Sequence, residues 1–165
     1  MQVAILSDTH VPSRAPAVPE WVLDEVRAAD HTIHAGDFDS SEAFGAVRDA
    51  AGDRLTVVAG NMDPHALDLP RVATVECDGV TFVVTHGTGD PENYESRVAA
   101  TVREAATDAD AVGVSGHTHQ VMDGVVDGVR LLNPGSATGA APATEATMFV
   151  ATVDGGELSV ERLRG

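Results

Sequence analysis

Five short apolar segments of this sequence each end in polar side chains that can bind a metal ion. Those polar residues are Asp8 and His10, Asp37, Asn61, His86, and His117 and His119. Short apolar runs that stop at turn residues are typical of strands buried on both faces of a parallel sheet. Ligands bind such sheets beyond the carboxyl ends of the strands. We therefore expect two carboxylates, one amide and four imidazoles to meet at one rim of the protein.

This donor set indicates a catalytic metal site. Nitrogen and oxygen donors without thiolate suit Mn, Fe, Co, Ni or Zn, of which we favour Mn. Seven donors exceed the needs of one tetrahedral ion and match two divalent ions that share a carboxylate. Two metals about 3.5–4 Å apart can polarise a phosphoryl group and lower the pKa of a bridging water. The sequence therefore predicts a two-metal site for phosphate-ester chemistry.

Each part of the pattern also has an ordinary structural explanation. Asp-x-His and His-x-His occur in surface loops, and Gly36-Asp37 and Gly60-Asn61 are common turn pairs. We favour the metal site over these explanations because each of the polar motifs directly follows an apolar strand. His34 precedes the end of its strand instead, so we expect a core histidine or one that orients Asp37.

The elements that must position these residues form one α/β unit. Helical spacing predicts helices over 20–29, 42–51 and 95–106. Apolar runs predict strands over 3–6, 32–35, 55–59 and 111–114. Turn signals predict three hairpins, built from 72–76 with 80–85, 121–126 with 129–132, and 147–153 with 157–162. We expect a single domain over 1–165, half of it α/β and half antiparallel β.

In this order the five blocks resemble the calcineurin-like metallophosphoesterases over nearly the full length. The blocks are Asp8-x-His10, Gly36-Asp37, Gly60-Asn61-x-Asp63, His86-Gly87 and Gly116-His117-x-His119. The short length and Leu132-Asn133-Pro134-Gly135-Ser136 are similar to the small phosphodiesterase family related to vacuolar protein sorting protein 29. The resemblance implies a four-layer αββα sandwich of two packed mixed β-sheets flanked by helices.

The resemblance also implies a role for each site residue. The residues that would hold the first metal are Asp8, His10 and His119. Those for the second are Asn61, His86 and His117, with Asp37 bridging the two ions. A metal-bound hydroxide would attack the phosphorus of a small phosphodiester. We count Asn61, Asp63 and His86 as catalytic, with Asn61 touching the phosphate and Asp63 orienting groups around it.

Two positions depart from the pattern of the superfamily. Many members carry a histidine where this sequence has Met62, and the fourth block often has one in place of Thr88. A general acid contributes about 10²–10⁴-fold to a rate. We therefore expect faster hydrolysis of aryl diesters, which have good leaving groups, than of alkyl monoesters.

Two other functions compete with the phosphodiesterase. The first is a metal-binding scaffold of the same fold with weak or no catalysis, which would have no chemical need for seven donors. The second is a nuclease for long nucleic acids. The net charge disfavours a nuclease, because the chain has 26 acidic and only ten basic residues, all of them Arg. A net charge of −16 repels the phosphates of a nucleic acid.

The acidic composition and the absence of targeting signals suggest where the protein works. Solubility alone would explain the charge, but we favour a cytosol with molar salt, which screens charges over roughly 3 Å. No stretch is long and apolar enough for a membrane span, and no signal peptide opens the chain. We expect a cytoplasmic protein without membrane contacts, and a homodimer through a strand edge or the rim loops stays open.

Overall fold

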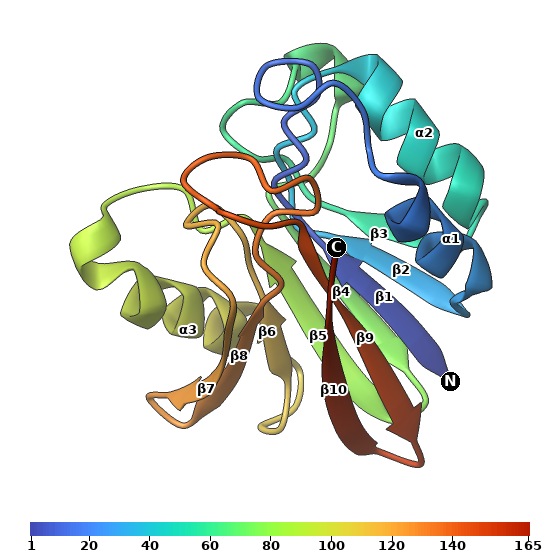
Figure 1. The fold of residues 1–165 in the computed structure, drawn as a ribbon. Helices are drawn as coiled ribbons and strands as arrows, with labels where there is room; N and C mark the ends of the chain where they lie inside the picture. Colours follow the sequence, from blue (N-terminus) through green and yellow to red (C-terminus); the bar gives the residue numbers. More distant parts are fainter.

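The computed structural model describes residues 1–165 and contains two five-stranded sheets packed face to face, with helices on their outer sides (Figure 1). The strand order is β10-β9-β1-β2-β3 in the first sheet and β4-β5-β6-β8-β7 in the second. Two helices cover the first sheet and one covers the second (Figure 1). The predicted four-layer sandwich of mixed sheets is confirmed.

The first sheet follows the expected strand–helix alternation. Its parallel strands are β1 (Gln2–Leu6), β2 (His31–His34) and β3 (Leu55–Val57), joined by α1 (Glu20–Ala28) and α2 (Ser41–Ala51). Ser40 begins α2, because its hydroxyl accepts a hydrogen bond from the Ala43 amide at 3.1 Å. The hairpin of β9 (Thr147–Asp154) and β10 (Glu157–Arg164) adds to the other edge of β1 in antiparallel orientation.

The second sheet is mixed, as expected, and combines the two predicted hairpins with one further strand. Its members are β4 (Val72–Cys77), β5 (Val80–Thr85), β6 (Val112–Val114), β7 (Met122–Val126) and β8 (Val129–Asn133). The two hairpins are present, but β6 lies between them and runs parallel to both β5 and β8. β6 can run parallel to β5 because α3 (Tyr94–Ala105) connects them. This crossover helix carries the chain back to the end of the sheet at which β5 begins.

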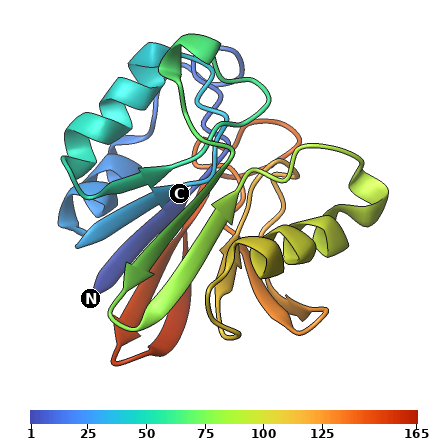
Figure 2. The same ribbon diagram turned by 180° about the vertical axis from the view of Figure 1, so that it is seen from behind.

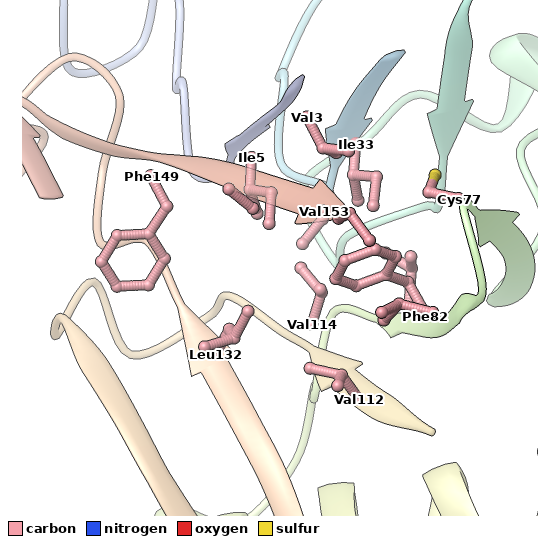
Figure 3. Packing of buried hydrophobic residues seen from close by; sticks show 14 of the residues in the cluster. Val3, Ile5, Ile33, Cys77, Phe82, Val112, Val114, Leu132, Phe149 and Val153 are labelled. Carbon is pink, nitrogen blue, oxygen red and sulfur yellow. The ribbon is translucent and has the colours of Figure 1, made fainter. Parts of the chain in front are cut away.

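The core between the sheets is a cluster of 15 buried hydrophobic residues. Because side chains alternate along a strand, Val3 and Ile5 of β1 face the second sheet while Leu6 faces the helices. Figure 3 shows Ile5 and Phe149 opposite Leu132 of the second sheet. This packing fixes the two sheets against each other and with them the loops that follow their strands.

The loops that follow the strands named in the sequence pattern lie at one end of the sandwich, at the top of Figure 2. Two short 3₁₀ turns, η1 (His65–Leu67) and η2 (Pro91–Asn93), belong to these connections. None of the helices has both the length and the apolar character needed to cross a bilayer.

Candidate metal centre

The loops after β1 and β2 continue to pair beyond the sheet. The amide of Asp8 donates to the carbonyl of Gly36 at 3.0 Å, and that of His10 to the carbonyl of Asp37 at 3.1 Å. This pairing places Asp8, His10 and Asp37 side by side above the ends of the strands.

The backbone around the site is strained at several positions. The residues with left-handed φ are Asp8 (52°), His10 (47°), Asp37 (63°), Asp39 (75°), His117 (71°) and His119 (58°). Side chains other than Gly rarely adopt this region, and such residues cluster where function requires them. These turns bring Asp8, His10, Asp37 and His119, which could hold a metal ion, close to one another.

Five buried side chains form the inner part of the site. Asp8 Oδ1 lies 3.3 Å from His119 Nε2 and 3.7 Å from His10 Nε2. Asp37 Oδ2 lies 3.1 Å from His86 Nε2 and 3.6 Å from His10 Nε2. The Nε2 atoms of His10 and His119 are 3.1 Å apart. The structure thus brings two carboxylates and three imidazoles from both sheets into contact.

The outer nitrogen of each of these three imidazoles has its own hydrogen-bond acceptor. The acceptors are Asp39 Oδ1 at 2.9 Å for His10, the Ala35 carbonyl at 2.7 Å for His86, and the Ala140 carbonyl at 2.8 Å for His119. These oxygens can only accept, so each Nδ1 carries the hydrogen and, in the neutral ring, each Nε2 presents a lone pair inward. This is the orientation that a metal-binding histidine needs.

His86 Nε2 is a buried polar atom without a hydrogen-bond partner. Asp37 Oδ2 is close to it, but the geometry is not that of a hydrogen bond. Buried polar groups are nearly always satisfied, so an orphan of this kind needs an explanation. Lone pairs and carboxylate oxygens that face one another require a cation between them, and the donors present fit divalent metal ions.

The pKa shifts of the buried groups also indicate that the site favours positive charge. Burial alone would raise the pKa of Asp8, but the neighbouring imidazoles of His10, His119 and His86 lower it. Burial would lower the pKa of His10 and His86, yet the neighbouring carboxylates outweigh burial and raise both pKa values. The two carboxylates therefore favour any cation at this point, whether a proton or a metal ion.

Two groups of side chains have the spacing of a metal site. They are Asp8, His10 and His119, and Asp8, Asp37 and His86, with the ligand atoms of each group within 4.8 Å of one another. Asn61 and His117 lie at the rim of the second group. His117 Nδ1 is 3.2 Å from Asn61 Oδ1, and the rings of His86 and His117 have centroids 5.2 Å apart. The structure thus brings all seven sequence-predicted ligands close together, five of them buried and two at the surface beside them.

Asp63 supports the site without joining it. Its carboxylate accepts four backbone hydrogen bonds, from Asp37 (2.9 Å), Phe38 (2.7 Å), Asp39 (3.1 Å) and Gly60 (2.8 Å). It therefore clamps the loops that carry Asp37 and Asn61, and it is a positioning residue.

Asp39 and Ser136 support the site, although sequence analysis assigned neither of them such a role. Asp39 accepts from His10 and from the hydroxyl of Ser13. Ser136, noted in the sequence only as part of a loop motif, donates to the Asp8 carbonyl at 2.7 Å and accepts from the Ala140 amide at 2.8 Å. The one available signal for Asp39 was its position two residues after Asp37.

Asn133 ties its own turn, as the loop motif predicts. Its Oδ1 accepts from the Gly135 amide at 3.0 Å, and its Nδ2 donates to the Gly116 carbonyl at 2.9 Å. Tyr94 of α3 donates to the same carbonyl at 2.6 Å. These contacts hold the start of the loop that carries His117 and His119.

His34 is a buried core residue, one of the two roles expected for it. Its Nδ1 accepts from the Gly36 amide at 3.1 Å, and its Nε2 lies 2.6 Å from the Thr9 hydroxyl. The ring stacks on Phe38 at a centroid distance of 3.7 Å. His34 thus supports the backbone around the site and makes no hydrogen bond to the Asp37 carboxylate.

Two glycines leave room for the carboxylates. A Cβ at Gly60 would overlap the Asp37 carboxylate, and a Cβ at Gly116 would overlap Ser7 and the Asp8 carboxylate. Neither glycine has a positive φ, so close approach alone explains the residue type.

A cleft of about 620 Å³ opens from the site. Asn61 and His86 belong to its lining, together with Thr88 and the α3 residue Arg97. Met62 is 46% exposed at the rim, so neither it nor Thr88 places an imidazole at the mouth of the site.

Comparison with known proteins agrees with this geometry. A sequence model described as the calcineurin-like phosphoesterase superfamily domain matches residues 1–156. A probable metallophosphoesterase of Methanothermobacter thermautotrophicus is 33% identical over 99% of this chain and 92% of its own length. A phosphodiesterase of Methanocaldococcus jannaschii is 26% identical over 84% of this chain and 86% of its own length.

Among solved structures, this chain is similar to Vps29 of Entamoeba histolytica in complex with zinc. The two share 25% sequence identity and a TM-score of 0.69 over 99% of each chain. The fold, the converging donors and the matched sequence model agree, and the chain belongs to the calcineurin-like phosphoesterase superfamily.

Proposed function

We propose that the protein is a metal-dependent phosphodiesterase that hydrolyses small phosphodiesters. The observation that carries the proposal is the buried set of two carboxylates and three inward-facing Nε2 atoms, one of them the unpartnered His86 Nε2. A phosphodiesterase among the relatives supports the reaction class. The superfamily supports the phosphate ester as substrate.

The chain offers ligands for two divalent ions. Asp8, His10 and His119 would hold one, and His86, Asn61 and His117 the other, with Asp37 shared. When bound, such ions polarise the phosphoryl group and make water a better nucleophile. Oxygen and nitrogen donors suit Mn, Fe, Co, Ni or Zn, of which we favour Mn. The zinc complex of a structural neighbour supports divalent metals in this fold.

Ring orientation and the residues at the mouth of the site also bear on how it would bind a phosphate. The hydrogen bonds from Nδ1 of His10, His86 and His119 fix their rings before any ligand binds. The side-chain amide of Asn61, exposed at the mouth, is placed to donate to a phosphate oxygen. Met62 and Thr88 provide no group that readily gives up a proton at neutral pH, so the stability of the leaving group controls the rate.

The test is hydrolysis of bis(p-nitrophenyl) phosphate in molar KCl by metal-stripped protein supplied with each divalent ion in turn. We expect metal-dependent release of nitrophenolate that is lost in Asp37→Ala and His86→Ala. His31→Ala is the matched control, since His31 bonds Thr56 in the sheet and lies outside the site. Faster hydrolysis of glycerol phosphate than of the aryl diester would contradict the role given to the leaving group.

A second candidate is a metal-binding scaffold with little catalysis, which the likeness to Vps29 favours. Uptake of two ions per chain without turnover of any diester would support the scaffold over the enzyme. Failure to bind metal would contradict both.

We also propose that the protein works in a cytosol of high salt. The net charge of −16 and the complete absence of Lys support this setting.

A further inference from the structure

The cleft beside the metal centre is suited to a polar ligand. It has a volume of about 620 Å³, and only four of its 17 lining residues are hydrophobic. Small-molecule sites have volumes of about 300–1,000 Å³ but are mostly apolar. Because Asn61 and His86 line its inner end, a diester bound at the metal centre would extend one of its two arms into this space.

Arg71 lines this cleft as an exposed cation without a partner. Arg27, Arg48 and Arg130 each pair with a carboxylate elsewhere in the molecule. The guanidinium of Arg71 has no carboxylate within 4.0 Å and no hydrogen bond within the chain. In a protein with 26 acidic residues, a cation left unpaired beside the site favours an anionic ligand.

Arg97 adds a second positive charge to the wall of the cleft. Its guanidinium donates to the carbonyls of Gly87 (3.2 Å), Thr88 (3.0 Å) and Asp90 (2.9 Å), and to Asn93. These partners are neutral, so the charge of Arg97 is not cancelled. Of the two lining carboxylates, Asp63 is occupied by four backbone amides, and Asp68 pairs with neither arginine.

A second groove borders the rim on the side of His117 and differs from the first because it has no arginine. It has a volume of about 520 Å³, and its lining includes Glu92 and Glu95 but no arginine. A phosphodiester with one anionic arm would meet cations in the first cleft and carboxylates in the second. The two grooves therefore favour the orientation of the diester in which its anionic arm lies in the first cleft.

We propose that this cleft binds an anionic group, a phosphate or a carboxylate, on one arm of the phosphodiester substrate, with Arg71 as the specificity-determining residue. The inference rests on the proposed phosphodiesterase function and names its substrate class. A planar guanidinium suits either anion, because both accept two parallel hydrogen bonds.

The test compares three substrates that release p-nitrophenolate and differ in their second arm: phenyl, 4-carboxyphenyl and 4-phosphonophenyl. We expect kcat/KM of the wild type to be about fivefold higher for the anionic arms than for phenyl. Arg71→Ala should remove the preference, so that kcat/KM for the anionic arms falls to about the value for the phenyl arm. Arg162→Ala, which removes an exposed and unpaired arginine of β10, is the matched control and should leave the preference intact. A greater gain for the phosphonate than for the carboxylate would identify phosphate as the natural anion.

A binding measurement separates this inference from the proposed function. Calorimetry on metal-loaded protein compares phenyl phosphate with 4-carboxyphenyl phosphate, and neither needs to be hydrolysed. Tighter binding of the carboxylated compound that Arg71→Ala abolishes supports the cleft, even if no diester is turned over. Equal binding and equal kcat/KM for charged and uncharged arms would overturn the inference while leaving the phosphodiesterase in place.

Discussion

Asp63 holds two loops of the metal centre together through one carboxylate. Asp63→Ala would leave four backbone amides without their acceptor, and we expect a loss of about 3 kcal/mol in the free energy of unfolding. Metal affinity should fall by about 10–100-fold, because the loop that carries Asp37 loses its support. Urea denaturation and metal-binding calorimetry measure the two effects.

Asp63→Asn is the conservative comparison for that experiment. It keeps one acceptor oxygen, so both losses should be smaller than in Asp63→Ala. Unchanged metal affinity in Asp63→Ala would mean that the clamp has no part in forming the site.

His34 predicts how stability depends on pH. Complete burial lowers its pKa to about 3 in the folded protein, from 6.5 in the unfolded chain. Between these values the unfolded state binds the extra proton, so the contribution of His34 is complete above pH 6.5 and is lost as the pH falls toward 3. Between pH 7 and pH 5 we expect a loss of about 2 kcal/mol in the free energy of unfolding.

His34→Asn isolates this effect, since Asn retains an acceptor near the Gly36 amide and does not titrate. Urea denaturation of both proteins at the two pH values gives the difference. The variant should be less stable at pH 7 and should lose less stability between pH 7 and pH 5. Parallel losses in the two proteins would assign the pH dependence to other groups.

At the residue scale, sequence reasoning predicts which polar side chains converge, because each of them lies in the loop that follows its strand. Asp8, His10 and His86 needed only a local pattern and the rule that ligands meet at the carboxyl ends of parallel strands. Their supporting acceptors could not be predicted the same way. The Ala35 and Ala140 carbonyls are backbone groups whose direction depends on tertiary structure and leaves no trace in residue type.

At the element scale, the close approach of two loops makes Gly60 a sensitive position. A methyl group in Gly60→Ala would collide with the Asp37 carboxylate, so the loop after β3 or Asp37 must move. We expect metal affinity to fall by about 10–100-fold, measured by calorimetry on metal-stripped protein.

Gly124→Ala is the matched control, because a Cβ at Gly124 of β7 has no atom within 4 Å. Its metal affinity should equal that of the wild type. Equal affinity in Gly60→Ala as well would show that the loops tolerate the added carbon.

The positions of helices and strands in the sequence were easier to predict than the pairing of the strands in the sheets. Every predicted helix and strand is present to within two residues at each end, because amphipathic spacing and turn residues are local signals. The position of β6 between β5 and β8 depends on the crossover through α3 and on burial of the core. Local patterns therefore predict the two hairpins of the second sheet but not the place of β6 between them.

At the scale of the whole molecule, the net charge predicts dependence on salt. Mutual repulsion among 26 acidic residues opposes the compact state, and ions screen it. We expect the melting temperature measured by circular dichroism to rise with KCl up to molar concentrations. Sucrose of equal osmolality is the control, since it stabilises by exclusion without screening charge. Equal melting temperatures with and without KCl would contradict adaptation to salt.

The two layers of strands meet the metal centre from opposite sides. Asp8, His10 and Asp37 come from the first sheet, whereas His86, His117 and His119 follow strands of the second. Ions held by both sets would join the two sheets at this end of the sandwich, in addition to the hydrophobic core that lies between them. Metal binding would then also stabilise the contact between the two sheets, and in metal-depleted protein we expect the sheets to separate first at the end that carries the proposed metal centre.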